Sequence, residues 1–254
     1  MNTAAPSLAA LLQLTDSALP TGAFSHSFGL EPYLDSGEVR DEATLLIWLE
    51  GYLSTQLTFT DAIAVRRACR LAPGLAADAG QEPAGGTCSE LSGVSREVSL
   101  RQLQELDAEL GALLIPRQLR EASLRMGRRL LEIAEESFPS PGVAAYARAV
   151  REGDCQGHFV LAFALAADGL GFEEDAVVEA HLSAALTSLA YNAVRAIPLG
   201  QLSGQRVLAG LRAQVPSAVV QSRDADERHF GAAAPALEIH QMRHEHQRAR
   251  MFAS

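Results

Sequence analysis

The stretch SALPTGAFSHSFGLE, residues 17–31, places His26 between Ser25 and Ser27. A serine hydroxyl becomes a nucleophile when a histidine within hydrogen-bonding reach takes its proton. The turn that usually presents such a serine has the pattern G-x-S-x-G between a strand and a helix, and this stretch has neither the spacing nor a strand. A Ser/His hydrolase centred on Ser25 and His26 is therefore one hypothesis. The other is a recognition turn in which Gly22 adopts an unusual backbone angle and Ser25 or Ser27 caps a helix.

A second group with chemical potential lies near the end of the sequence. His240 and His244 are four residues apart and share one face if the segment is helical, and Glu245 and His246 follow directly. Imidazole nitrogens are good ligands for nickel and zinc. A nickel-binding chaperone that uses these histidines is therefore an alternative hypothesis. The competing interpretation is a polar tail whose histidines contact water or a partner.

Two further patterns favour contact with other molecules. In RAIPLGQLSGQRVL, residues 195–208, the amides of Gln201 and Gln205 are four residues apart at the start of a helix. They can bind an extended partner segment or cap a break inside the fold. In RMGRRLLEI, residues 125–133, three arginines form a basic edge beside apolar residues, which is either a solvated face or a docking site.

Composition excludes several classes of protein. The formal charge of −10 argues against nucleic-acid binding, which needs clustered cations. All 21 basic residues are arginines, so the P-loop lysine, the Schiff-base lysine and the Ser-Lys dyad are excluded. These absences narrow the chemistry available to the chain, for which we expect no cofactor.

The cysteines and the apolar segments indicate the compartment. Cys69, Cys88 and Cys155 are widely spaced and form no C-x-x-C pattern, which is typical of a reducing cytosol. The first residues lack the cationic start of a secretory signal. The most apolar stretch, residues 158–172, is interrupted by Asp168 before it reaches the roughly 20 residues of a membrane helix. The sequence predicts a cytoplasmic protein without a membrane span.

Apolar residues recur at intervals of three and four, and β-branched residues are sparse, which predicts an all-α protein. We expect a single domain, residues 1–254, built as a helical bundle of about ten helices. A flexible loop is expected at about residues 73–95 and a polar C-terminal tail at about 235–254. Asp41 is expected to cap one helix, and a new helix is expected to begin at Thr60 or Asp61. Residues 158–167, apolar on every side, predict the central helix. Further helices are expected at 7–16, near Ser27, at 96–114 and 120–137, from 141 to near Gly153, at 173–195 and from 203.

Five segments, in order, resemble the urease accessory protein UreF family. The opening LLQLTDSALPTGAFSHSFGLE is similar to the family's first signature, and the last segment is similar to its C-terminal signature. The resemblance spans almost the whole chain, although the loop at 73–95 is longer than we expect for the family. Between the opening and the last segment lie REASLRMGRRLL, GHFVLAFALAADGLG and RAIPLGQLSGQRVL. The last segment is PALEIHQMRHEHQRARMFAS.

The resemblance implies an all-helical, homodimeric scaffold without enzymatic activity. Such a scaffold binds UreH, also called UreD, and recruits the GTPase UreG, so that nickel is delivered to apo-urease. For the surface facing UreG it implies Ser27, Gly29, Glu31, Gln201 and Gln205. For the contact with UreH it implies Met242, Arg243, His244, Glu245, Arg250 and Phe252. Because the chain has no lysine for a P-loop, any nucleotide energy must come from a partner.

Overall fold

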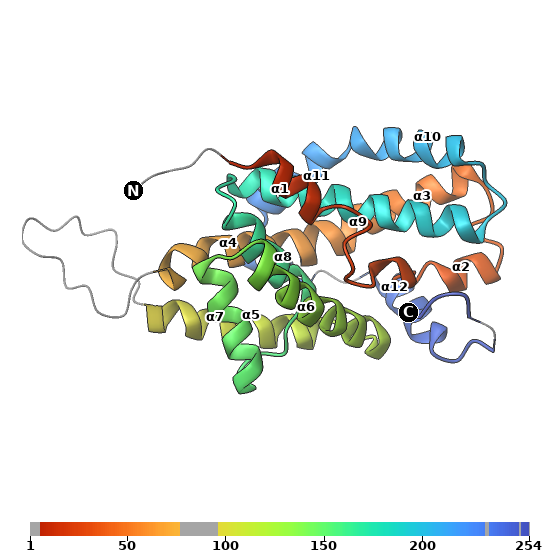
Figure 1. Cartoon of the computed structure of the whole chain (residues 1–254). Helices are drawn as coiled ribbons and strands as arrows, with labels where there is room; N and C mark the ends of the chain where they lie inside the picture. Colours follow the sequence, from red (N-terminus) through yellow and green to blue (C-terminus); the bar gives the residue numbers. More distant parts are fainter. Residues whose placement is uncertain (1–5, 77–95, 232–233, 249, 254) are drawn as a thin grey trace, which may run out of the picture.

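The computed structural model describes residues 6–76, 96–231, 234–248 and 250–253 (Figure 1). These residues form helices and connecting turns, and none of them is in a strand, so the all-α prediction is confirmed. The α-helices are α1 (Leu8–Leu14), α2 (Glu31–Asp35), α3 (Glu42–Tyr52), α4 (Ala62–Leu75), α5 (Arg96–Leu113), α6 (Arg117–Ser137), α7 (Pro141–Glu152), α8 (Phe159–Asp168), α9 (Glu174–Ala196), α10 (Gln201–Arg212), α11 (Val215–Asp224) and α12 (Pro235–His244).

Helix α8 is the centre of the fold, as its composition predicts. Every residue from Val160 to Ala167 is buried. Helices α4, α6, α7 and α9 pack against it (Figure 1). An α-helix without a polar face has no surface that water stabilises, so it is enclosed by other helices.

Helices α3 and α4 are parts of one continuous helical segment. The predicted cap at Asp41 is confirmed, because its side chain accepts from the N–H of Thr44 at 2.9 Å and the Thr44 hydroxyl accepts from the N–H of Asp41 at 3.1 Å. The predicted start at Thr60 or Asp61 is wrong. The chain instead continues through a π-helix, η2 (Leu53–Asp61), which has a wider turn than an α-helix but leaves the helical segment uninterrupted. The side chain of Asp61 does not cap this helix.

The opening segment, residues 17–31, is mostly irregular. Gly22 has φ +87°, so the expected unusual backbone angle is confirmed, and it precedes a 3₁₀ turn, η1 (Ala23–Ser25). The expected helix near Ser27 is displaced, because α2 begins at Glu31 without a side-chain cap. The Ser25 hydroxyl donates to the Gly22 carbonyl at 2.8 Å and closes the turn instead of capping a helix.

A buried arginine joins three helices. The guanidinium of Arg66, on α4, has a side chain only 2% exposed and donates to Glu174 and Asp175 at the start of α9. It also donates to the hydroxyl of Ser222 and the carbonyl of Val219 on α11. Four of its five N–H hydrogens therefore donate to acceptors, which is the kind of pairing that a buried charge requires.

The two segments expected to be irregular have different outcomes. Helix α4 continues through Pro73 to Leu75, so the expected loop is wrong at its first residues, and residues 77–95 lie outside the described part of the chain. The tail contains α12, which packs against α2 and α6 (Figure 1). No helix in the described part of the chain combines the length and apolar composition of a membrane span.

Candidate functional site

The opening segment and the C-terminal tail form a shared polar junction, residues 24–31 with residues 241–248 and 250–253. Helix α12 turns Leu237, Gln241 and His244 inward and leaves Met242 and Arg243 exposed. The inward residues are at positions i, i+4 and i+7, which is the spacing of one helical face. One face of α12 therefore belongs to the protein interior, although two of its three residues are polar.

Glu31 is the centre of this junction. One carboxylate oxygen lies 2.8 Å from Nε2 of His244 and accepts from the N–H of Phe252 at 3.1 Å. The other oxygen accepts from the N–H of Met251. On its far side the His244 imidazole lies 2.7 Å from Oε1 of Gln118, on α6. A single carboxylate on α2 thus binds both α12 and the segment after it.

The backbone of the opening segment is bound by residues from distant parts of the chain. The carbonyl of Phe28 accepts from Nε2 of Gln241 at 3.0 Å, and the carbonyl of Ser25 accepts from the N–H of Ala253 at 2.7 Å. The carbonyl of His26 accepts from the amide of Asn192, on α9, at 2.7 Å. These bonds fix the shape of a segment that has little helix of its own.

Gly29 lies close to the side chain of Gln241 on α12. It has φ +95°, a conformation that L residues rarely adopt, and a Cβ built on it would overlap the side chain of Gln241. Phe28, directly before it, is the one residue other than glycine with a positive φ, +52°, among the described residues. Two consecutive residues in this region of φ produce a sharp bend against α12.

The residues expected to contact partners divide into buried and exposed groups. Glu31 and His244, which the resemblance assigned to different partner surfaces, are in direct contact. Glu245 is half-buried and pairs with Arg117. The buried group is Ser27, Gly29, Glu31, His244 and Phe252, and the exposed group is Gln201, Gln205, Met242, Arg243 and Arg250.

The two glutamines lie apart from the junction. Gln201 and Gln205 are on α10, which Figure 1 shows across α9 from α12. The Gln205 side chain donates to the hydroxyl of Tyr191 at 3.0 Å. The structure therefore places the expected partner residues in two separate regions.

The geometry gives Ser25 and His26 structural roles. The Ser25 hydroxyl donates within its own turn, and the His26 ring lies beside Phe28 with centroids 5.9 Å apart. Burial, with smaller electrostatic contributions from Arg125 and His244, lowers the pKa of His26 from 6.5 to about 4. An imidazole with this pKa is a weak proton acceptor at neutral pH.

The tail histidines are held by different neighbours. His240 stacks on Tyr33 with ring centroids 3.9 Å apart, and its Nδ1 lies 2.7 Å from the carbonyl of Ala236. His244 binds Glu31, and His246 is exposed. In the part of the chain that the structure describes, no three His, Cys, Asp or Glu residues are grouped so as to hold a metal ion.

One polar pair that sequence reasoning missed lies at the inner end of the π-helix. Nε2 of His181, on α9, is 3.1 Å from Oδ2 of Asp61. The two residues are 120 positions apart and belong to no motif, so no pattern in the sequence connects them. Both line a cavity of about 120 Å³ beside the opening segment.

These features define an all-α protein whose opening segment and tail bind each other around one buried carboxylate. A family model described as UreF matches residues 39–212. The chain is 48% identical over 245 residues to the urease accessory protein UreF of Arthrobacter sp. (strain FB24), with 96% of each chain covered. It is 46% identical to that of Paenarthrobacter aurescens (strain TC1), covering 96% of this chain and 97% of the relative, and 41% identical to that of Corynebacterium efficiens, covering 96% of each. The chain belongs to the UreF family of urease accessory proteins.

Proposed function

We propose that this protein is a non-enzymatic adaptor in urease maturation. It binds UreH (UreD), recruits the GTPase UreG and supports nickel insertion into apo-urease. This proposal rests on the junction. Its buried residues fix the conformation of the opening segment and the tail, and so hold the exposed residues of both segments in a defined arrangement. Membership of a family of urease accessory proteins supports a role for this surface in urease maturation.

The exposed side of the junction has the composition of a binding surface. Phe24 is 60% exposed and Met251 is 64% exposed. They lie close together, because the residue after Phe24 accepts a backbone hydrogen bond from Ala253. Exposed aromatic and methionine side chains are typical anchors at interfaces. Arg243 and Arg250 are exposed nearby in the sequence, so we assign the contact with UreH to this surface.

The division between buried and exposed residues refines the expected contacts. Met242, Arg243 and Arg250 are assigned to direct contact with UreH, whereas His244 and Phe252 position the tail. Gln201 and Gln205, exposed on α10, are assigned to the surface facing UreG. Glu31 acts on either partner through the tail that it binds. The protein is expected to work in the cytoplasm as a homodimer, without nucleic acid or membrane.

Co-expression with UreH and UreG, followed by size-exclusion chromatography with mass measurement, tests the proposal. We expect a complex that contains all three proteins and at least two copies of this chain. Arg243→Glu and Met251→Asp are expected to remove UreH while the variants retain their helical circular dichroism. Arg148→Glu, on the exposed side of α7, is the matched control and should retain UreH. If both tail variants still co-elute with UreH, the assignment of this surface is wrong.

The two alternative functions have their own measurements. A Ser/His hydrolase would be labelled stoichiometrically by a fluorophosphonate, and the label would be lost in Ser25→Ala. A nickel-binding chaperone would bind one nickel ion tightly as an isolated protein, and the double variant His240→Ala, His244→Ala would not. We expect neither result, because the Ser25 hydroxyl and the two imidazoles are engaged inside the fold.

A further inference from the structure

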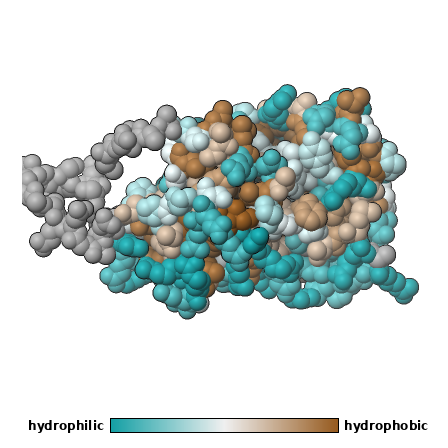
Figure 2. Space-filling view, viewed as in Figure 1, coloured by the Kyte–Doolittle hydropathy of each residue, from teal (hydrophilic) through white to brown (hydrophobic). Residues whose placement is uncertain are grey.

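The cavity beside the opening segment is large enough for a small molecule. Its volume of about 120 Å³ compares with an engineered apolar cavity of roughly 150 Å³ that binds benzene. Figure 2 shows apolar side chains gathered near the middle of the face on which the opening segment lies. The apolar wall includes Leu57, Leu114, Leu119, Met126, Phe159 and Phe163.

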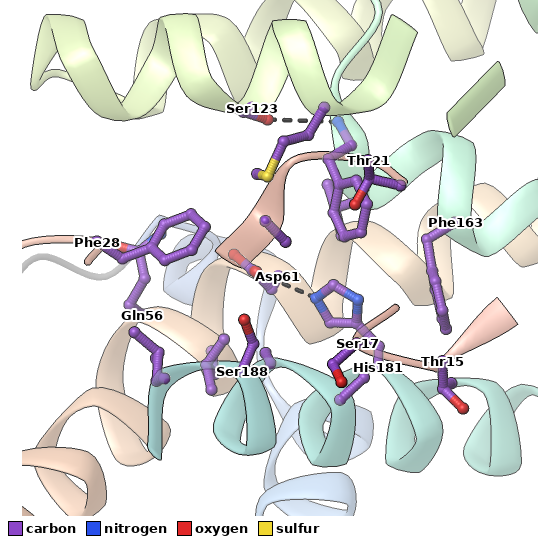
Figure 3. Close-up of a pocket in the computed structure, with 18 of the residues that line it drawn as sticks. Thr15, Ser17, Thr21, Phe28, Gln56, Asp61, Ser123, Phe163, His181 and Ser188 are labelled. Carbon is purple, nitrogen blue, oxygen red and sulfur yellow. Dashed lines mark hydrogen bonds and ion pairs between the residues drawn. The ribbon is translucent and has the colours of Figure 1, made fainter. Parts of the chain in front are cut away.

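The wall also carries polar side chains, among them one hydrogen-bonding pair. Asp61 and His181 form the pair described above, and Ser17 and Ser188 also line the cavity (Figure 3). The Asp61 side chain is 24% exposed, so its carboxylate can accept a further hydrogen bond. His181 also lies against aromatic rings, with its centroid 5.1 Å from that of Phe163. An apolar cavity with a few convergent polar groups is the usual form of a ligand site.

Two backbone irregularities border the same cavity. Its wall includes Gln56, Leu57 and Asp61 of the π-helix, a form that is rare and frequent at functional sites. Phe28, with its φ of +52°, is also part of the wall. Strained residues persist where the surrounding structure holds them, and they cluster at ligand sites and switches.

Phe28 connects the cavity to the tail. Its ring lines the cavity, while its carbonyl accepts from Gln241 on α12. The next residue, Gly29, packs against the same Gln241 side chain. A molecule that presses on the Phe28 ring therefore acts on a residue whose backbone is bound to the tail.

We propose that this cavity binds a small neutral aromatic molecule that carries one O–H or N–H donor, and that its occupation stabilises the docked tail through Phe28. The aromatic body matches the volume and the phenylalanine rings, and the donor matches the carboxylate of Asp61. A purely apolar ligand would leave that acceptor without a partner. A metal ion would find two ligands in the Asp61–His181 pair, fewer than such ions require.

Phenol and toluene are suitable probes, because they have similar volumes and differ in the hydroxyl donor. Binding is measured on the full chain by ligand-observed NMR, with the fluorescence of the single tryptophan, Trp48, as a second readout. Trp48 stacks on Tyr52 with ring centroids 5.3 Å apart, and Tyr52 lines the cavity. We expect phenol to bind with a Kd of about 1 mM or tighter, a modest affinity for a ligand of this size.

Variants of the wall distinguish the cavity from other places on the protein. Ala185→Phe fills the space and is expected to abolish phenol binding. Ser183→Phe, exposed on the same helix, is the matched control and should bind phenol as the wild type does. Asp61→Asn is expected to weaken phenol about fivefold and leave toluene unchanged, because hydrogen bonds to an ionised acceptor are roughly twice as strong as neutral ones. Absence of phenol binding to the wild type, or binding that persists in folded Ala185→Phe, would overturn the assigned site.

The link to the tail has a separate measurement. Saturating phenol is expected to slow hydrogen exchange of the Met251 and Phe252 amides by about fivefold, near the lower end of typical couplings between sites. Ala185→Phe should show no response to phenol. Phenol that binds in the cavity and leaves this exchange unchanged would refute the coupling through Phe28. These readouts involve neither UreH nor UreG, so they are independent of the adaptor role.

Discussion

Replacing Glu31 with glutamine removes the negative charge of the junction and keeps the volume of the side chain. The carboxylate receives three hydrogen bonds, from Nε2 of His244 and the N–H groups of Met251 and Phe252. A glutamine side chain keeps one acceptor oxygen. Its other terminal group, NH₂, is itself a donor and would face one or two of the three donors from which the carboxylate accepts. Hydrogen bonds to charged groups contribute about 1.5–3 kcal/mol each, and neutral ones about 0.5–1.5 kcal/mol. Losing at least one bond and weakening the others therefore lowers the free energy of tail undocking by about 3 kcal/mol.

Trypsin reports this change directly, because the tail offers cleavage sites after Arg243, Arg248 and Arg250. A loss of about 3 kcal/mol raises the undocked population by roughly 10²-fold. We expect Glu31→Gln to be cleaved in the tail faster by about this factor, while the rest of the chain resists. Asp35→Asn removes the same charge from the exposed end of α2 and should be cleaved at the wild-type rate.

Hydrogen exchange of the C-terminal peptide gives the same quantity without a protease. Equal cleavage and exchange in Glu31→Gln and the wild type would refute the central role of the carboxylate. Equal acceleration in Asp35→Asn would refute it as well, because the effect would then follow the net charge of α2 and not the contacts of Glu31.

Arg66→Met is expected to lower the free energy of unfolding by about 3 kcal/mol, because it removes a buried cation that makes four hydrogen bonds and leaves the carboxylates of Glu174 and Asp175 without it. The exposed Arg70→Met should lower it by less than about 1 kcal/mol, and denaturant titration compares the two. Gly29→Ala should accelerate tail cleavage, and Gly37→Ala, with φ +74° and open space around it, should not, which separates overlap with α12 from backbone strain. His26 binds its proton more weakly in the folded protein than in the unfolded chain, so its contribution to stability is complete above about pH 6.5 and is lost as the pH falls towards 4. Between about pH 7 and about pH 5 the free energy of unfolding of the wild type should therefore fall by about 2 kcal/mol more than that of His26→Gln, measured by denaturant titration.

Much of the fold could be predicted because apolar periodicity reports burial directly. The central position of α8 followed from an uninterrupted apolar run, and the cap at Asp41 followed from a polar residue before an apolar series. The π-helix could not be predicted in this way. Its extra residue per turn shifts the apolar face, and Asp61 then reads as a new cap although the backbone continues.

The candidate site was predicted less well, because its contacts join residues far apart in the sequence. Glu31 and His244 are separated by 213 positions, and each has a plausible exposed role when read alone. One local signal was available. Leu237, Gln241 and His244 recur at the spacing of a helical face, which indicates that the tail has an inner side. Because Gln241 and His244 are polar, a search for apolar periodicity does not detect this spacing.

The hydrogen bonds of the opening segment explain why its shape depends on the tail. A segment with little regular structure must find partners outside itself for its backbone carbonyls, because burying them without partners is costly. Here those partners are the side chains and N–H groups of α9, α12 and the C-terminal end, and they bind the carbonyls of Phe24, Ser25, His26 and Phe28. Undocking the tail removes two of these partners, those of Ser25 and Phe28, and leaves the two from α9. The segment would then stay attached to α9 at one end and lose its fixed bend at Phe28, next to the cavity. A change at the tail is therefore expected to reach the cavity wall, and a ligand in the cavity is expected to reach the tail, by the same few bonds.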